Sequence, residues 1–340
     1  MGGVCGMGKI LKKWGIVACV AFAVFAVFTI KTYGVSENLT TQMLSDTEKN
    51  KEEIARIVLN DTGRNAVFEP QEAVNVTVYE GDLLGNGQQQ VAIAVSFGLK
   101  NTVLAVYTKD ATGDGYTYVG DVADFFDVRD VFFLPLTGNG TNIMIVREYA
   151  NQTIGAFERS SFLKGYIWDE ENNEFQNVLS IPEGIEVIWN GRWDTSQEER
   201  WQKIEERSEA TQTQVENSDG PALKLVQYQA YRISDSTDTE NIPDDSTFHT
   251  VKNRVVNQIY YWDNQWRRFI LSEKKEPATG QTVAIIEDFS ASPYILVPEY
   301  EGGYNNVLIQ RQDGSVEIVS MDTLLEMDGS QAKSAVSSYE

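Results

Sequence analysis

The sequence has 340 residues, which is enough for one large β domain or two smaller domains after a short N-terminal segment. Hydrophobic residues make up 42% and aromatic residues 11%, which excludes a globally disordered chain and predicts a folded core. The 28 Lys and Arg residues are outnumbered by 50 Asp and Glu residues, and the net charge is −22. Such an acidic surface disfavours nucleic acid and anionic lipid as partners; it suits solubility first, and also a cation or a basic partner.

The N-terminal segment has the composition of a membrane anchor. Residues 14–30, WGIVACVAFAVFAVFTI, carry no charge and approach the length that a helix needs to span a bilayer. Three lysines lie within residues 9–13 and Lys31 alone follows closely, so the positive-inside rule places the N-terminus in the cytoplasm. A cleaved signal peptide has the same order of features, but residues 32–34 make a poor cleavage site, and an uncleaved anchor is favoured. We therefore expect a single-pass protein of the cell membrane, with residues 1–35 as cytoplasmic tail and anchor and the remainder extracellular.

Cysteine and histidine are scarce after the anchor. Both cysteines, Cys5 and Cys19, lie in the N-terminal segment, so the extracellular part forms no internal disulfide and has no thiol nucleophile. His249 is the only histidine, which excludes a metal centre built from several histidines. The sequence also lacks G-x-S-x-G, Walker A and dinucleotide-binding glycine patterns. These absences favour a protein that is not an enzyme.

Residues 36–63 predict a short helical stalk. Ser45 and Glu48 have the spacing of a capping box, which satisfies free amides at a helix start. The helix is expected to end near Asn60, before Gly63. We expect its apolar face to pack on the β domain, and this face comprises Ile54, Ile57 and Val58.

From Val74 onward the apolar period is two residues, which is typical of strands. The run VAIAVSF at 91–97 is apolar on both faces and predicts an inner strand. Turns are indicated by GNG at 85–87 and GDG at 113–115. Four strands are therefore predicted in this region, at 74–78, 91–97, 102–108 and 116–122.

The same elements recur further along the chain. GNG at 85–87 returns at 138–140, and each copy precedes a predicted strand. A hairpin that contains Tyr-x-Trp-Asp occurs at 166–169 and again at 260–263. We expect repeated four-stranded units to fill residues 64–328 and to give a mainly β, propeller-like ectodomain.

These repeats resemble the FG-GAP/VCBS type of β-propeller repeat, in which a calcium-binding turn precedes an inner strand of each blade. The resemblance covers about residues 74–180 and, less closely, 225–320. It implies propeller-like blades and a binding role. For the first of these turns, at residues 82–86, an Asx-type turn is the simpler explanation. Both copies depart from the family pattern, with Asp82, Leu84 and Asn86 in the first and Pro135, Thr137 and Asn139 in the second.

Residues 194–247 are expected to form a helical and acidic insertion between repeated units. Within it, SQEERWQKIEERSEA at 196–210 predicts a charged helix, because a capping box opens it. The stretch SDSTDTENIPDD at 234–245 predicts a solvated loop. After the last unit, residues 329–340 are small and polar and are expected to form a flexible tail.

One stretch resembles a calcium-binding loop. Asp110, Thr112 and Asp114 alternate, Gly115 follows them, and Asp121 occupies the twelfth position. Thr stands where a second acid is usual, and Asp121 stands in place of a bidentate Glu. A hairpin turn in which Asp114-Gly115 supplies a positive φ explains the same residues and is favoured over calcium.

Together these expectations indicate a membrane-anchored extracellular binding or scaffold module whose partner is a protein or a cell-wall polymer. Two alternatives remain open. One is a structural subunit of an envelope assembly. The other is a carbohydrate-active enzyme that uses a pair of carboxylates. In that second alternative, aromatic side chains would stack on sugars, with Trp189, Trp193, Trp262 and Trp266 as candidates.

Overall fold

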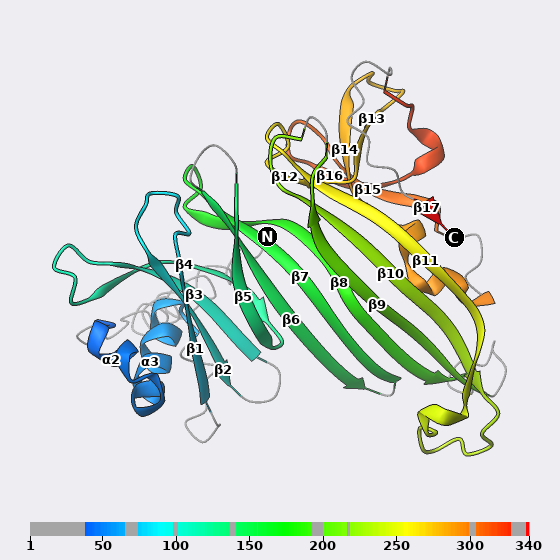
Figure 1. Cartoon of the computed structure of the whole chain (residues 1–340), viewed down its shortest axis with the longest axis horizontal. Coiled ribbons are helices and arrows are strands. Elements are labelled where there is room, and N and C mark those ends of the chain that lie inside the picture. Colours follow the sequence, from blue (N-terminus) through cyan, green and yellow to red (C-terminus); the bar gives the residue numbers. More distant parts are fainter. Residues whose placement is uncertain are drawn as a thin grey trace, which may run out of the picture. The chain divides into compact units, whose positions relative to one another are not determined.

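The structure is a computed structural model that describes residues 38–64, 74–97, 101–136, 141–154, 156–191, 200–215, 218–298, 304–327 and 338–339. It is mainly β, as predicted, with three antiparallel sheets (Figure 1). The predicted anchor at 14–30 lies outside the described residues, and within them no helix is long and apolar enough to cross a membrane. The chain divides into two compact units, and every element below belongs to the second, Leu39–Glu340.

Two consecutive helices open this unit, α2 (Thr41–Ser45) and α3 (Thr47–Asp61). The predicted capping box is wrong, because Asp46 caps α3 and accepts a hydrogen bond from a first-turn amide at 3.4 Å. Ser45 is the last residue of α2, and its hydroxyl donates to a carbonyl oxygen of that helix at 2.8 Å. The end of α3 is one residue beyond the predicted Asn60.

The apolar face of α3 packs on the first sheet, as predicted. Ile54, Ala55 and Val58 have no exposed surface. Burying an Ile or Val side chain contributes roughly 1.5–3 kcal/mol, so α3 is held as a covering layer of the sheet. Its partners are alternate residues of the central strands, Val91, Ile93, Val95, Val103, Ala105 and Tyr107.

The first sheet is a four-stranded antiparallel meander, and it confirms the four strands predicted here. Its central strands are buried on both faces, because α3 covers one face and the second sheet contacts the other through Ala92, Leu104 and Val106. Two-sided burial explains why the run at 91–97 is apolar at all positions but one. The strands are β1 (Val74–Gly81), β2 (Gln90–Phe97), β3 (Asn101–Lys109) and β4 (Tyr116–Phe125).

The second sheet has nine strands, and β5 to β12 follow one another as neighbours. The predicted second and third units therefore share one sheet, and none of the three sheets closes on itself within the described residues. Of the predicted flexible tail, the structure describes only Ser338–Tyr339, which form β17 and pair with β11. The other strands are β5 (Val128–Pro135), β6 (Asn142–Ile154), β7 (Ala156–Asp169), β8 (Glu174–Asn190), β9 (Trp201–Thr213), β10 (Ala222–Ser234), β11 (Phe248–Asp263) and β12 (Arg268–Ile270).

The helix predicted over residues 196–210 is wrong where the structure describes it, because β9 occupies this part of the chain. β9 pairs with β8 on one side and with β10 on the other, so neighbouring strands satisfy its backbone N–H and C=O groups. Glu, Gln, Lys and Arg favour helices, and here tertiary pairing overrides that weak propensity. β9 and β10 are thus part of the sheet, although both lie within the predicted insertion. The acidic stretch after β10 is a loop, as predicted.

The third sheet is again a four-stranded antiparallel meander. One of its faces packs on the second sheet through Val283, Ile285, Val307 and Ile309. After β14 the chain forms two short 3-10 helices, and the second of them, η4, contacts β9 and β10. The elements are β13 (Ser272–Lys275), β14 (Thr282–Asp288), η3 (Phe289–Ala291), η4 (Pro293–Leu296), β15 (Asn306–Gln310), β16 (Val316–Ser320) and η6 (Met321–Thr323), while η2 (Asp245–Thr247) precedes β11.

Candidate functional site

The predicted calcium loop is the turn that joins β3 to β4. Its first acid, Asp110, accepts hydrogen bonds from the Thr112 hydroxyl at 2.7 Å, the Thr112 amide at 2.9 Å and the Gly113 amide at 2.8 Å. The Thr112 hydroxyl and these amides hold the pKa of Asp110 below its ordinary value. Positive φ occurs at Gly113 (78°), so the prediction that Asp114-Gly115 supplies it is wrong. A Cβ at residue 115 would lie 2.5 Å from Asp110 Oδ2, so a larger residue there would displace this carboxylate.

The fourth predicted ligand, Asp121, points to other partners. It lies on β4, where its carboxylate accepts the Tyr118 hydroxyl at 2.6 Å and lies 3.0 Å from Arg64 Nη2. Asp114 contributes its backbone oxygen, which accepts the Thr41 amide at 3.0 Å. Among the described residues, no three His, Cys, Asp or Glu side chains gather as metal ligands. Calcium binding by Asp110, Thr112, Asp114 and Asp121 stays a prediction.

The first GNG turn has the geometry of the Asx-type alternative. Asp82 accepts the Asn86 amide at 3.2 Å through Oδ1 and the Gly87 amide at 2.9 Å through Oδ2. The buried Gln90 side chain completes the turn, because its Oε1 accepts the Leu83 amide at 2.6 Å. The turn therefore uses its oxygens on its own backbone. The second GNG copy, at 138–140, lies outside the described residues.

The two Tyr-x-Trp-Asp sequences form the same hairpin twice. In the first, between β7 and β8, Trp168 pairs with Phe175 across the strands, and their ring centroids are 5.0 Å apart. In the second, between β11 and β12, Trp262 pairs with Phe269 in the same register at 5.8 Å. Each four-residue loop ends in a residue of positive φ, Asn173 (52°) or Arg267 (50°). The two hairpins thus share strand register, loop length and the position of positive φ.

A cavity of about 490 Å³ lies between these hairpins. Arg267 Nη2 approaches Asp169 Oδ1 at 3.7 Å and links the second loop to the first. Asp169 is buried, and its pKa is held low, chiefly by a hydrogen bond from the Asn172 side chain. Trp262 and Trp266 are only 4% exposed, so neither offers a ring face for stacking on sugar. Trp193 lies outside the described residues.

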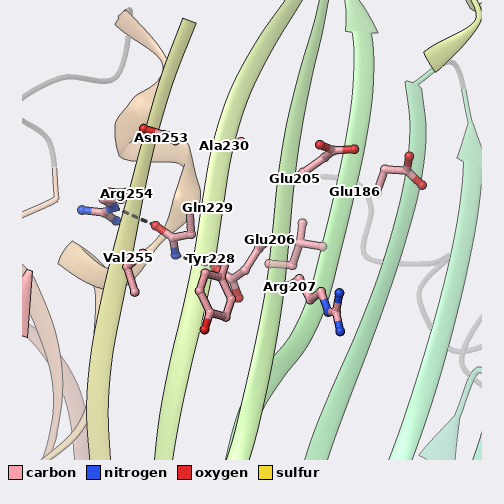
Figure 2. A pocket seen from close by; sticks show the side chains of 11 residues that line it. Glu186, Glu205, Glu206, Arg207, Tyr228, Gln229, Ala230, Asn253, Arg254 and Val255 are labelled. Carbon is pink, nitrogen blue, oxygen red and sulfur yellow. Dashed lines mark hydrogen bonds between the residues drawn. The ribbon is translucent and has the colours of Figure 1, made fainter. Parts of the chain in front are cut away.

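A groove of about 690 Å³ lies over β8–β11 (Figure 2). Side chains alternate between the faces of a sheet, so residues paired across strands share a face. Ala230 is the smallest side chain in the groove, and its larger neighbours leave a hollow above it. The rows that build the groove are Glu186, Glu205, Ala230 and Asn253 in one and Arg207, Tyr228 and Val255 in the next.

An ion-pair network stands at the acidic end of the groove. Lys203 Nζ lies 2.8 Å from Glu186 Oε1, 2.5 Å from Glu205 Oε1 and 2.7 Å from Asp245 Oδ1. Burial alone would lower the pKa of Lys203, but these hydrogen bonds outweigh burial, and its pKa is raised. Arg232 adds a contact of 3.2 Å to Glu205. The network holds the carboxylates of Glu186 and Glu205 in place and attaches the acidic loop to the sheet through Asp245.

The opposite end of the groove is open. Arg207 and Tyr228 are cross-strand partners, and their side chains lie beside each other in Figure 2. The Arg207 side chain is 82% exposed, and Tyr228 is 47% exposed. A guanidinium and a phenol ring therefore face solvent next to a hollow.

The sequence analysis missed these groove residues because it assigned 196–210 to a helix. A signal was nevertheless present in ALKLVQYQAYRIS, the sequence of β10, where small or apolar residues alternate with polar ones. Such alternation predicts a strand, but it places the glutamines on the solvent-facing side, whereas Gln227 and Gln229 are each 2% exposed and Tyr228 is 47% exposed.

Comparisons with known proteins give no identity for the chain. No protein-family model matches it, and no curated protein matches it. The function is therefore inferred from the geometry of the groove.

Proposed function

We propose that this chain is a binding module, held at the outer side of the cell membrane by residues 14–30, that binds a protein partner through the groove over β8–β11. The observation that carries this proposal is the exposed pair Arg207 and Tyr228 beside the hollow at Ala230. Tyr and Arg are enriched among the residues that dominate protein–protein binding energy.

The groove is also organised before a partner arrives. Lys203 holds the carboxylates of Glu186 and Glu205, so their side chains lose little additional freedom on binding. A pocket rimmed by carboxylates and a phenol ring suits a basic or aromatic side chain that enters above Ala230. The excess of acidic over basic residues in the chain favours a basic partner and steers its approach.

The repeat interpretation is part of this proposal. The two Trp-Asp hairpins share register, loop length and the position of positive φ, which supports their origin from one repeated unit. A propeller-like arrangement of such units stays a prediction of the sequence.

The test is photo-crosslinking in the native host. A photoreactive phenylalanine analogue replaces Tyr228 in the full chain, and mass spectrometry identifies the attached molecules. The matched control carries the analogue at Ile318, which is 56% exposed on β16. One or two proteins that attach at position 228 and not at 318 are expected. Attachment of cell-wall polymer alone, or equal patterns at both positions, would overturn the protein-partner proposal.

A second variant tests the hollow directly. Ala230→Trp fills it without altering a core side chain, and we expect the crosslinked product to fall at least tenfold. Thr117→Trp places the same bulk at an exposed position of β4 and should leave the product unchanged. Unaltered crosslinking in Ala230→Trp would show that the hollow is not the contact.

The location is tested separately. Added protease should degrade residues beyond the anchor in intact cells, and the chain should remain in the membrane fraction after a high-salt wash. Release by salt, or full protection from protease, would contradict the proposed anchor and orientation.

A further inference from the structure

A second cavity, of about 170 Å³, lies between β7–β11 and the segment Asp288–Pro293. This segment is attached to the sheet by side chains that donate to its carbonyl oxygens. Arg254 Nη2 donates to Ser290 O at 2.9 Å and to Ser292 O at 2.8 Å, and Gln229 Nε2 donates to Ala291 O at 2.6 Å. The alternation of side chains along β10 and β11 puts this cavity on the opposite face from the groove.

Two polar atoms in residues that line this cavity have no hydrogen-bond partner in the described chain, Gln227 Oε1 and Gln258 Nε2. Both residues are only 2% exposed. A buried polar group without a partner is destabilising, and such groups are rare in folded proteins. The pair therefore points to a ligand or to ordered water in the cavity.

One polar atom of each side-chain amide already has a hydrogen bond, and this bond identifies the atom that is left without a partner. Gln227 Nε2 donates to Glu206 Oε1 at 3.1 Å, which leaves its oxygen as a free acceptor. Gln258 Oε1 accepts the Tyr260 hydroxyl at 3.4 Å, which leaves its nitrogen as a free donor. Gln258 pairs with Leu225, which lies two residues before Gln227 on β10. The two glutamines are therefore diagonal neighbours on one face of the sheet, with Cα atoms about 7–8 Å apart.

The two atoms without partners, one acceptor and one donor, determine which kind of ligand can bind. A metal cation cannot satisfy the donor of Gln258, and an anion cannot satisfy the acceptor of Gln227. A hydroxyl group satisfies both, since it donates one hydrogen bond and accepts others. Glu206, which is 5% exposed, adds a further acceptor, and Phe162, Tyr260 and Phe289 supply apolar wall.

We propose that this cavity binds one small, neutral, polyhydroxylated molecule, with one hydroxyl bridging Gln227 Oε1 and Gln258 Nε2 and a second donating to Glu206. The volume equals about six water molecules at roughly 30 Å³ each, which fits a single sugar ring or cyclic polyol rather than a chain. Polar groups against an aromatic wall are typical of small-molecule sites. The proposal does not depend on the groove, because neither Gln227 nor Gln258 lines it.

The test measures binding of glucose, N-acetylglucosamine and myo-inositol to the full chain in a detergent without sugar headgroups. Saturation-transfer NMR detects bound ligand and its dissociation constant. At least one probe should saturate in the millimolar range. Gln258→Leu should weaken its binding tenfold or more, and Gln212→Leu, at an exposed position of β9, should not.

Gln258→Met serves as a second variant, because it keeps the length of the side chain but can neither donate nor accept a strong hydrogen bond. Loss of binding in both variants, with thermal melting like that of the parent chain, would support the site. The proposal is overturned if no probe saturates, which would mean ordered water only, or if binding persists in both variants.

Discussion

The first sheet and the β8–β11 part of the second sheet are both antiparallel, yet they bury different chemistry. The central strands of the first sheet are covered on both faces by apolar side chains from α3 and from the second sheet. β9 and β10 instead carry buried charge and amide groups, with Lys203 on one face and Glu206 on the other. An apolar face contributes stability without specifying a partner, whereas a polar face must have each group paired. The comparison therefore assigns stabilisation of the fold chiefly to the first sheet, and the binding that we propose concerns β8–β11.

The largest effect is expected in the first sheet. Ile93→Ala removes a side chain with no exposed surface between β2 and α3. We expect the free energy of unfolding to fall by about 4 kcal/mol, from lost burial and the remaining cavity. Urea denaturation of the purified chain measures it, with Val316→Ala, at a half-exposed position of β16, as control. A loss below about 1 kcal/mol would mean that the α3 layer contributes little.

A smaller effect is expected from the ion-pair network. Lys203→Met removes the cation from three carboxylates, and we expect the free energy of unfolding to fall by about 2 kcal/mol. This is less than the roughly 3–5 kcal/mol for a fully buried pair, because the carboxylates regain water. A double-mutant cycle with Asp245→Asn isolates one contact. Additive losses in that cycle would show that the acidic loop is not attached through Lys203.

The pH dependence of stability tests the face of β9 that carries Glu206. Burial raises the pKa of Glu206 above its ordinary value of 4.5, although Gln227, Gln229 and Ser208 donate to it. The folded state therefore binds this proton more tightly than the unfolded state. The resulting stabilisation is complete below pH 4.5 and is lost as the pH rises through the raised pKa.

Glu206→Gln removes this titration and keeps an acceptor for the neighbouring amides. We expect the free energy of unfolding of the variant, relative to the parent chain, to increase between pH 4 and pH 8. Denaturation curves across that range measure the difference. A difference that is constant with pH would mean that Glu206 titrates like a solvated carboxyl group.

The smallest effect is expected at the β3–β4 turn. Backbone amides and the Thr112 hydroxyl already occupy Asp110, and Arg64 occupies Asp121. Millimolar Ca²⁺ should leave the melting temperature of the chain unchanged, as differential scanning calorimetry would show. A rise that Asp110→Asn abolishes would contradict the turn interpretation and establish the calcium site predicted from the sequence.

Local patterns predicted much of the fold correctly. The alternating apolar residues of 74–122 and their glycine turns define four strands, and α3 has the predicted apolar face. The Tyr-x-Trp-Asp sequences mark two hairpins, because a cross-strand Trp–Phe pair and a residue of positive φ lie within eight residues of each other. All these features depend on neighbours in sequence.

The candidate sites depend on residues that are distant in sequence. Glu and Lys made residues 201–210 look helical, and only pairing with β8 and β10 makes them a strand. The groove requires Arg207 beside Tyr228, and the second cavity requires Gln227 near Gln258 beneath the segment after β14. By itself the sequence determined the strands and turns whose signals are local. Tertiary structure alone decided which polar side chains share a face and which are buried, because strand partners and covering segments come from elsewhere in the chain.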